Sequence, residues 1–333
     1  MAVDGASARG PEYKPPLYRR VLNISEIGVL VAVIVFFVAF TVANSSMAAP
    51  KNLALMALQG SFLGLAAFGM SFLMIAGEID LSSGATAGLA AAVAGLLLAN
   101  GGWPEWASYA AALIVAMCVG LINSFVVLKI RMPSFFATLG SSFIVWGLAI
   151  WLLKGQWIYV GEMIPQLKSV LSPSPLFGLS YVFLALLAAY MIGDLLMRTS
   201  RLGSVISAVG ANRRAAAIVG INVTLVKTLC FVFVSLCCGM AGLLVIGYGG
   251  TTDASIGEGW LLWVIAIVII GGGSLRGGVG SIIGVLLGTI LIQVIRIGMA
   301  NAGVQTNAQG IVVGAILIGA AAIDALRRRA IQY

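Results

Sequence analysis

Two stretches of the sequence repeat one pattern of glycine, aspartate and serine. The first is Gly77-x-x-Asp80-x-Ser82-x-Gly84, and the second, 173 residues later, is Gly250-x-x-Asp253-x-Ser255-x-Gly257. Carboxylate, hydroxyl and amide groups can hydrogen-bond a neutral hydroxylated ligand, and charges beside long apolar runs are costly and usually functional. The candidate ligand-contacting or gating residues are Glu78, Asp80, Ser82, Ser83, Asn123, Asp253 and Ser255.

Asp80 has two interpretations that the residues leave open. Its carboxylate can cap the apolar helix that follows, by accepting hydrogen bonds from free backbone N–H groups at the helix start. It can instead contact a substrate directly. Asparagine caps helices nearly as well as aspartate, so the substitution Asp80→Asn separates the two interpretations.

The residue types exclude several chemistries. The chain has no histidine, so an imidazole metal ligand or general base is excluded. Its four cysteines form no CxxC pair, and no phosphate-binding P-loop pattern is present. We therefore expect a protein that is not an enzyme, with no catalytic residue, metal site or cofactor. Any ATP chemistry has to come from a partner chain.

The composition places these residues in a membrane protein. Of 333 residues, 61% are hydrophobic and only 9% are charged, and the mean hydropathy is +1.08. Because about 20 apolar residues cross a bilayer as a helix, the sequence predicts an all-α, polytopic membrane protein with about ten spans. The predicted spans are 25–43, 53–76, 82–99, 107–128, 134–153, 179–197, 225–247, 259–274, 280–298 and 310–326.

Lysine and arginine residues predict the orientation. If both termini face the cytoplasm, fifteen of the nineteen basic residues lie on the inner side, as the positive-inside rule requires. The net charge of +8 therefore reflects membrane orientation rather than nucleic-acid binding. The predicted organisation is a basic cytoplasmic tail (1–24), a transmembrane domain (25–326) and a second basic tail (327–333).

The inner segment 198–224 is one of two long connections. Within it, Asn212 is a predicted helix cap, residues 213–219 form a short amphipathic helix, and Gly220 is its stop. Such a helix either lies on lipid headgroups or docks into a partner protein; at about two turns it is too short to bind lipid strongly, which favours the partner. The predicted coupling residues are Gly210, Asn212, Arg213, Arg214, Ala215, Ala216, Gly220 and Ile221, with small alanines that let a partner approach.

The repeated motif also predicts internal symmetry. The same shift of 173 residues carries the second to fifth spans close to the seventh to tenth. An odd number of spans separates the two copies, so they cross the membrane in opposite directions. This is the pattern of an inverted repeat, which gives a transporter mirror-related inward and outward states.

Four stretches resemble the permease subunits of bacterial ribose-type ABC importers for monosaccharides and polyols. They are Gly77–Gly84, Pro133–Gly140, the segment Gly210–Ile221 in the coupling position, and the glycine-rich run Gly271–Gly280. The resemblance implies a permease in the bacterial cytoplasmic membrane that dimerises with a second copy or a related chain. It also implies an extracytoplasmic sugar-binding protein and ATPase subunits that hold Mg-ATP. Glu78 departs from the glycine typical of the family, which puts the substrate in doubt.

Other functions are alternatives to a sugar permease. A branched-chain amino-acid ABC permease shares the general plan. An ion-coupled secondary transporter would be complete in one chain, but the few carboxylates within spans and the coupling-like segment argue against it. A passive channel is the remaining alternative. Transport by this chain alone in proteoliposomes would separate these classes.

Overall fold

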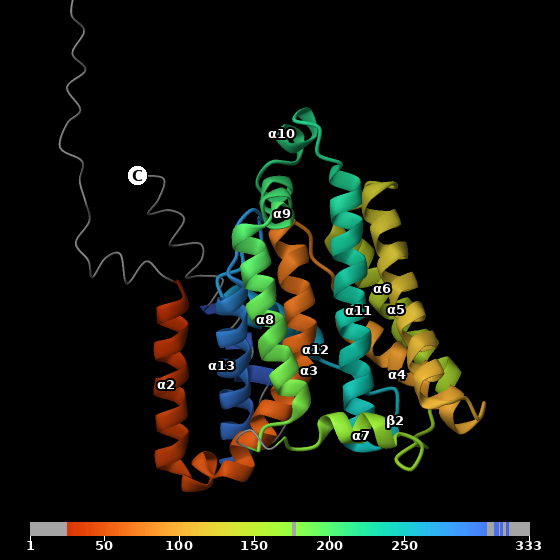
Figure 1. The fold of residues 1–333 in the computed structure, drawn as a ribbon, viewed down its shortest axis with the longest axis vertical. Helices are drawn as coiled ribbons and strands as arrows, with labels where there is room; N and C mark the ends of the chain where they lie inside the picture. Colours follow the sequence, from red (N-terminus) through yellow and green to blue (C-terminus); the bar gives the residue numbers. More distant parts are fainter. Residues whose placement is uncertain (1–24, 175–177, 305–309, 313, 316–317, 320–333) are drawn as a thin grey trace, which may run out of the picture.

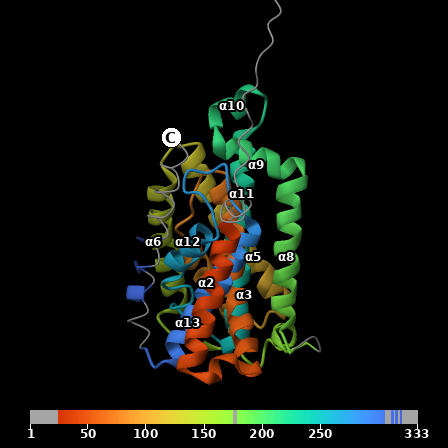
Figure 2. The same ribbon diagram turned by 90° about the vertical axis from the view of Figure 1, so that its left-hand side faces the viewer.

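The structure, a computed structural model, describes residues 25–174, 178–304, 310–312, 314–315 and 318–319. In this part of the chain it is a bundle of helices that lie roughly side by side (Figures 1 and 2). The elements are α2 (Ser25–Ala43), the 3-10 turn η1 (Ser45–Ala48), α3 (Pro50–Ile75), α4 (Ser83–Ala99), α5 (Glu105–Leu128), α6 (Ser134–Leu153), β1 (Ile158–Tyr159), α7 (Pro165–Leu171), α8 (Tyr181–Thr199), α9 (Arg201–Ala211), α10 (Arg213–Ile218), α11 (Val223–Gly249), β2 (Thr251–Thr252), α12 (Trp260–Ile270) and α13 (Ile282–Asn301).

The bundle has two distinct ends. The short helix α10 stands beyond the long helices at one end, and α7 and β2 lie at the other (Figure 1). We call these the α10 end and the α7 end. At the α7 end, β1 pairs with β2 in a two-stranded antiparallel ribbon, with Ile158 opposite Thr252.

Seven of the described helices are long and apolar enough to cross a membrane: α2, α3, α5, α6, α8, α11 and α13. This confirms seven of the ten predicted spans. In apolar surroundings a helix is favoured because it satisfies its own backbone hydrogen bonds. Among the others, α4 has 17 residues and α12 only 11, so both are shorter than these seven helices. The predicted span 310–326 and both terminal tails lie largely outside the described residues.

The described helices repeat in opposite directions. Shifting the numbers of α3 by 173 gives 223–248, and α11 is Val223–Gly249. The same shift relates α4 to α12 and α5 to α13. In Figure 1, α3 rises toward the α10 end, whereas α11 starts beside α10 and runs toward the α7 end. The opposite direction is thus seen for α3 and α11, and the same shift in numbering relates the other two pairs. The counterpart of α6 lies largely outside the described residues.

Two re-entrant segments lie at the centre of this repeat. The first, residues 76–82, follows α3 at the α10 end, and the second, residues 250–259, follows α11 at the α7 end. The two segments begin at opposite ends of the bundle. A Cβ added at Gly84 would nevertheless overlap the carbonyl oxygen of Gly257, and a Cβ added at Gly257 would overlap the carbonyl oxygen of Gly84. Both segments therefore run into the interior, and the short helices α4 and α12 begin where they meet.

Glycine lets the second segment lie against α4 along its length. A Cβ at Gly88 would lie 2.5 Å from the Ile256 carbonyl oxygen, and one at Gly95 would overlap the side chain of Thr252. Larger side chains on this face of α4 would push the segment away. The core that surrounds the contact is apolar and comes mainly from α3, α11, α12 and α13.

The connection 198–224 is more helical than the sequence predicts. Besides α10, it forms α9, whose start is capped by the Ser200 side chain. Ile206 and Val209 are spaced three residues apart on one face of α9, and both are buried. The predicted long loop is therefore a pair of short helices at the α10 end (Figure 2).

Candidate functional site

Asp80 lies at the centre of a buried polar network. Its side chain is fully buried, and Oδ1 accepts hydrogen bonds from the Ser82 backbone N–H (2.7 Å) and hydroxyl (2.6 Å). Asn123, from α5, donates through Nδ2 to the Ser82 hydroxyl at 2.9 Å and lies 3.4 Å from Asp80 Oδ1. The structure thus brings together three of the residues selected from the sequence.

This arrangement refines the expected cap. The helix α4 has Ser82 at its N-cap position, and the Ser82 side chain makes no capping bond there. Asp80 instead closes the turn just before the helix, a common use of aspartate side chains. Asp80 therefore fixes the approach to α4 rather than capping its first turn.

Neighbouring elements hold the first re-entrant segment in place. The Leu81 backbone N–H donates to the Thr138 hydroxyl of α6 at 2.9 Å. Thr86, one turn into α4, lies with its hydroxyl 3.4 Å from that of Ser82. Ser83 is also buried, and its Oγ has no hydrogen-bond partner among the described residues. That hydroxyl is a free polar group beside the Asp80 network.

The second copy of the motif forms the same turn in an open setting. Asp253 Oδ1 accepts from the Ser255 backbone N–H at 2.7 Å and from the Ser255 hydroxyl. Asp253 is partly exposed and Ser255 is exposed. No hydrogen bond among the described residues joins this pair to the Asp80 network. The two acidic turns are related by the repeat but form separate sites.

Glu78 belongs to a different set of contacts. Its Oε1 is 2.6 Å from Nζ of Lys227 in α11, and the two side chains are only 13% and 6% exposed. The sequence selected Glu78 but not Lys227, which it counted only as an inner-side positive charge. A lysine near the start of an apolar run is the signal that could have identified it, because charges in spans are usually paired.

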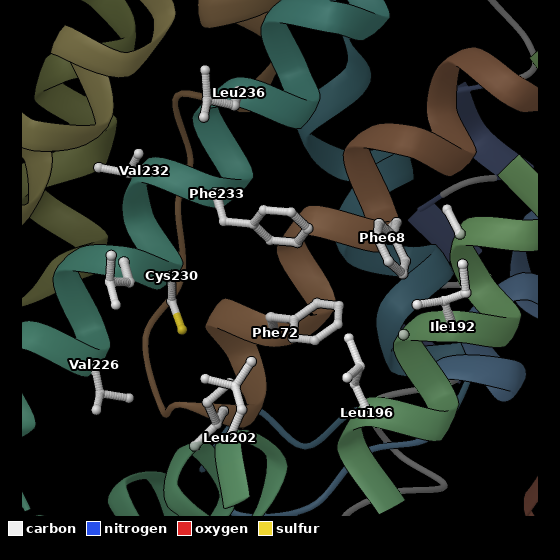
Figure 3. A pocket seen from close by; sticks show the side chains of 14 residues that line it. Phe68, Phe72, Ile192, Leu196, Leu202, Val226, Cys230, Val232, Phe233 and Leu236 are labelled. Atoms are coloured by element: carbon white, nitrogen blue, oxygen red, sulfur yellow. The ribbon is translucent and has the colours of Figure 1, made fainter. Parts of the chain in front are cut away.

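An apolar pocket of about 650 Å³ lies between α3, α8, α9 and α11 (Figure 3). Phe68, Phe72 and Phe233 project into it, and Cys230 lies on its wall. No hydroxyl, amide or carboxylate side chain lines this pocket, although a hydroxylated ligand needs such partners when it leaves water. This pocket is unsuited to a polar ligand.

The α10 end carries the predicted coupling residues. The Asn212 side chain accepts from the backbone N–H groups of Arg214 and Ala215 at 3.1 and 3.0 Å, which confirms the predicted cap. The helix ends at Ile218, and Gly220, with φ +87°, is the predicted stop. Arg213 is exposed.

Two of the predicted coupling residues face inward. Ala216 is 3% exposed and packs with Val209 and Val223, so it joins α10 to α9 and α11 rather than meeting a partner. Ile221 packs against the same cluster. The most exposed large apolar residues of this region are instead Ile218 (86%) and Val219 (75%), which the sequence did not select. The prediction that a partner approaches Ala216 is therefore wrong.

Gly210 has a packing role within the chain. A Cβ at position 210 would overlap the Ile75 carbonyl oxygen and lie 2.5 Å from the Gly278 nitrogen. The Gly278 N–H donates to that same carbonyl at 2.8 Å. Three backbones, from the ends of α3 and α9 and from the loop before α13, thus meet at one point.

These features define a class of protein. Within the described part of the chain, no three cysteine, aspartate or glutamate side chains gather as metal ligands. Membrane helices in inverted repeats, with polar groups at breaks in the helices, are typical of transporters, and the fold and site place this chain among them.

The family follows from comparison with known proteins. The family described as "Branched-chain amino acid transport system / permease component" matches residues 52–321. The chain belongs to this family of transport permeases.

Several curated relatives match along most of their length. The galactose/methyl galactoside import permease protein MglC of Escherichia coli (strain K12) is 32% identical, with 91% of this chain and 95% of the relative covered. The L-arabinose ABC transporter permease protein AraH of Azospirillum brasilense is 28% identical, with 92% and 89% covered. The ribose import permease protein RbsC of Bacillus subtilis (strain 168) is 29% identical, with 90% and 93% covered.

Proposed function

We propose that this chain is the membrane-spanning permease subunit of a bacterial ATP-binding-cassette importer for a monosaccharide or sugar alcohol. The observation that carries the proposal is its similarity to import permeases for galactose, arabinose and ribose over at least 90% of the chain. In this proposal, an extracytoplasmic binding protein delivers the substrate, and separate ATPase subunits that hold Mg-ATP drive its movement through the cytoplasmic membrane.

The alternatives have less support. The family description names branched-chain amino acids, but the three relatives compared above are permeases for sugars. A carboxylate within a span is a common proton or ion site of a secondary transporter. Asp80 is engaged by two hydrogen bonds from Ser82, and Glu78 is ion-paired with Lys227, so the two carboxylates of the first re-entrant segment are not available in this conformation.

The shape of the α10 end supports docking of an ATPase subunit there. Ile218 and Val219 are large apolar side chains exposed at the far end of the molecule, and a protein groove would cover them. Arg213 and Arg214 are exposed beside them and can meet acidic groups around such a groove. In this proposal α10 is the coupling helix, and the α10 end faces the cytoplasm together with both termini.

The orientation has its own test. A cysteine at the exposed Ser204 of α9 should react with an impermeant maleimide only after the membrane is opened, in a variant whose exposed native Cys118 is replaced by serine. A cysteine at the exposed Ser172, near the α7 end, should react in intact cells. The reverse pattern would contradict the orientation.

One reconstitution experiment tests the function. We expect proteoliposomes with this permease, its ATPase subunits and its binding protein to take up a labelled pentose, hexose or polyol only when ATP is enclosed. The permease alone should give no uptake, because the chain lacks a nucleotide-binding motif. Uptake by the permease alone would contradict the proposal and favour a secondary transporter or a channel.

The same system distinguishes a partner groove from a lipid surface at α10. Tryptophan favours the membrane interface, so Val219→Trp should leave uptake intact if α10 lies on lipid. If α10 sits in a groove of the ATPase, the larger side chain should reduce both ATPase co-purification and uptake. Ser204→Trp, at an exposed position on α9, is the matched control and should change neither.

A further inference from the structure

Glu78 and Lys227 form a largely buried ion pair near the α10 end. The Nζ–Oε1 distance is 2.6 Å, and Lys227 as a residue is 4% exposed. In the described part of the chain, both other ion pairs use Arg198, whose side chain is 59% exposed. Removing one partner of a buried pair is costly because it leaves an uncompensated charge, so this pair constrains its two segments strongly.

The pair connects two elements with different roles. Lys227 lies in the second turn of α11, the helix that follows α10 and whose start is capped by the Asn222 side chain. Glu78 lies two residues before Asp80, and its backbone N–H donates to the Leu73 carbonyl at 3.1 Å. Gly77, with φ +82°, makes that turn possible. Glu78 is therefore fixed to the end of α3 and leads directly into the Asp80 segment.

A glycine junction ties the same elements together. It consists of Gly77, Gly210, Gly277 and Gly278, which bring the ends of α3 and α9 into backbone contact with the loop before α13. A Cβ at Gly277 would lie 2.5 Å from the Gly77 Cα and 3.1 Å from the Gly210 carbonyl oxygen. Because these backbones are in contact and the Gly278 N–H is hydrogen-bonded to the Ile75 carbonyl, movement of α9 toward the junction displaces the start of the first re-entrant segment.

We propose that the Glu78–Lys227 pair and the glycine junction form the mechanical link that transmits movement of α9 and α10 to the Asp80 segment. This inference rests on the proposed function, because it takes α10 as the contact with the ATPase. The junction joins the segment to α9, and the ion pair joins it to α11. The helices before and after α10, which are α9 and α11, are thus both connected to the first re-entrant segment.

The test uses the reconstituted complex with its ATPase subunits and binding protein. The double variant Glu78→Gln/Lys227→Met removes both charges with little change in volume, which a fold often tolerates. We expect normal co-purification of the ATPase, about tenfold slower uptake, and loss of stimulation of ATP hydrolysis by the substrate-loaded binding protein. The charge-reversed variant Glu78→Lys/Lys227→Glu should recover uptake, because it restores the pair.

A control variant tests whether the effect is specific to the Glu78–Lys227 pair. Asp194→Asn breaks the ion pair that Asp194 makes with Arg198 at 2.7 Å and should leave uptake unchanged. Wild-type uptake and stimulation in the neutral double variant would overturn the link. If the neutral double variant fails to accumulate, the charge-reversed variant is compared with the single variant Lys227→Met, which leaves Glu78 without its partner. A charge-reversed permease that folds but takes up substrate no faster than Lys227→Met would overturn the link. Failure of the proposed function would appear separately, as a wild-type complex without ATP-driven uptake.

Discussion

The two re-entrant segments have the same turn in different surroundings. In each, an aspartate accepts hydrogen bonds from the backbone and the hydroxyl of the serine two residues later. Asp80 is fully buried and meets Asn123, whereas Asp253 is partly exposed and, among the described residues, is hydrogen-bonded by Ser255 alone. The repeated motif determines the turn, but the surrounding helices determine whether the carboxylate is enclosed or accessible.

This difference separates two roles within one repeat. The first segment is held by the Asp80 network, the Glu78–Lys227 pair and Thr138 of α6. The second is held by packing against the glycines of α4, by the β1–β2 ribbon and by Trp146 of α6, whose indole N–H donates to the Ala254 carbonyl at 2.9 Å. We therefore expect the two copies to respond unequally to polar substitutions and equally to substitutions at their shared glycine contact.

The largest effect should come from the glycine contact itself. Gly84→Ala places a methyl group against the Gly257 carbonyl oxygen, which the backbone can relieve only by moving the two segments apart. We expect a loss of stability of about 3 kcal/mol, seen as a lower unfolding temperature in detergent. Gly257→Ala should cost at least as much because its φ is +84°.

Gly140→Ala is the control for this comparison. Position 140 lies in α6, and a Cβ there has no atom within 4 Å. Alanine favours a helix over glycine, so its stability should be unchanged or slightly raised. Equal stability of Gly84→Ala and Gly140→Ala would contradict the close contact.

A smaller effect should separate the two aspartates. Asp80→Ala leaves the buried Ser82 backbone N–H and hydroxyl without their acceptor, which should cost about 1–3 kcal/mol. Asp253→Ala should cost less, because water can replace the carboxylate at a partly exposed turn. Thermal unfolding of both variants measures the difference. Equal losses would mean that burial does not distinguish the two turns.

The smallest effect should come from Asp80→Asn. Asparagine keeps an oxygen that can accept both bonds from Ser82, so the stability cost should be about 0.5 kcal/mol or less. Uptake should then remain close to wild type. If uptake is abolished while the variant reaches the membrane in normal amounts, the negative charge itself is required, and a substrate or gating role replaces the positional one.

Much of the fold was predictable from the hydropathy of the chain, but the two short helices were not. Residues 82–99 and 259–274 are as apolar as the longer spans although their helices are shorter, because a core helix and a lipid-facing helix share this composition. Three glycines, residues 271–273, end α12 at Ile270. The mean hydropathy of residues 259–274 does not reveal this end, because it averages the glycines with the apolar residues before them. The helix α9 was missed because Gly203 and Gly210 lower its intrinsic propensity.

The candidate site was predictable in its residue types and only partly in its contacts. Asp80, Ser82 and Asn123 were selected separately and lie together. The partners Lys227 and Thr138 come from helices whose register against the first re-entrant segment depends on packing. Ala216 was assigned to the wrong surface, because a two-turn helix does not reveal which of its faces the neighbouring helices cover.

The contact between Gly84 and Gly257 has a consequence for biosynthesis. Residue 257 is made 173 residues after residue 84, which at common rates of synthesis is a delay of roughly 10 to 30 seconds. During that interval α4 is already made but lacks the segment that covers its glycine face, and α3 lacks its packing against α11. The first half of the repeat is therefore an incomplete structure in the bilayer, and its core closes only when the second half has been inserted.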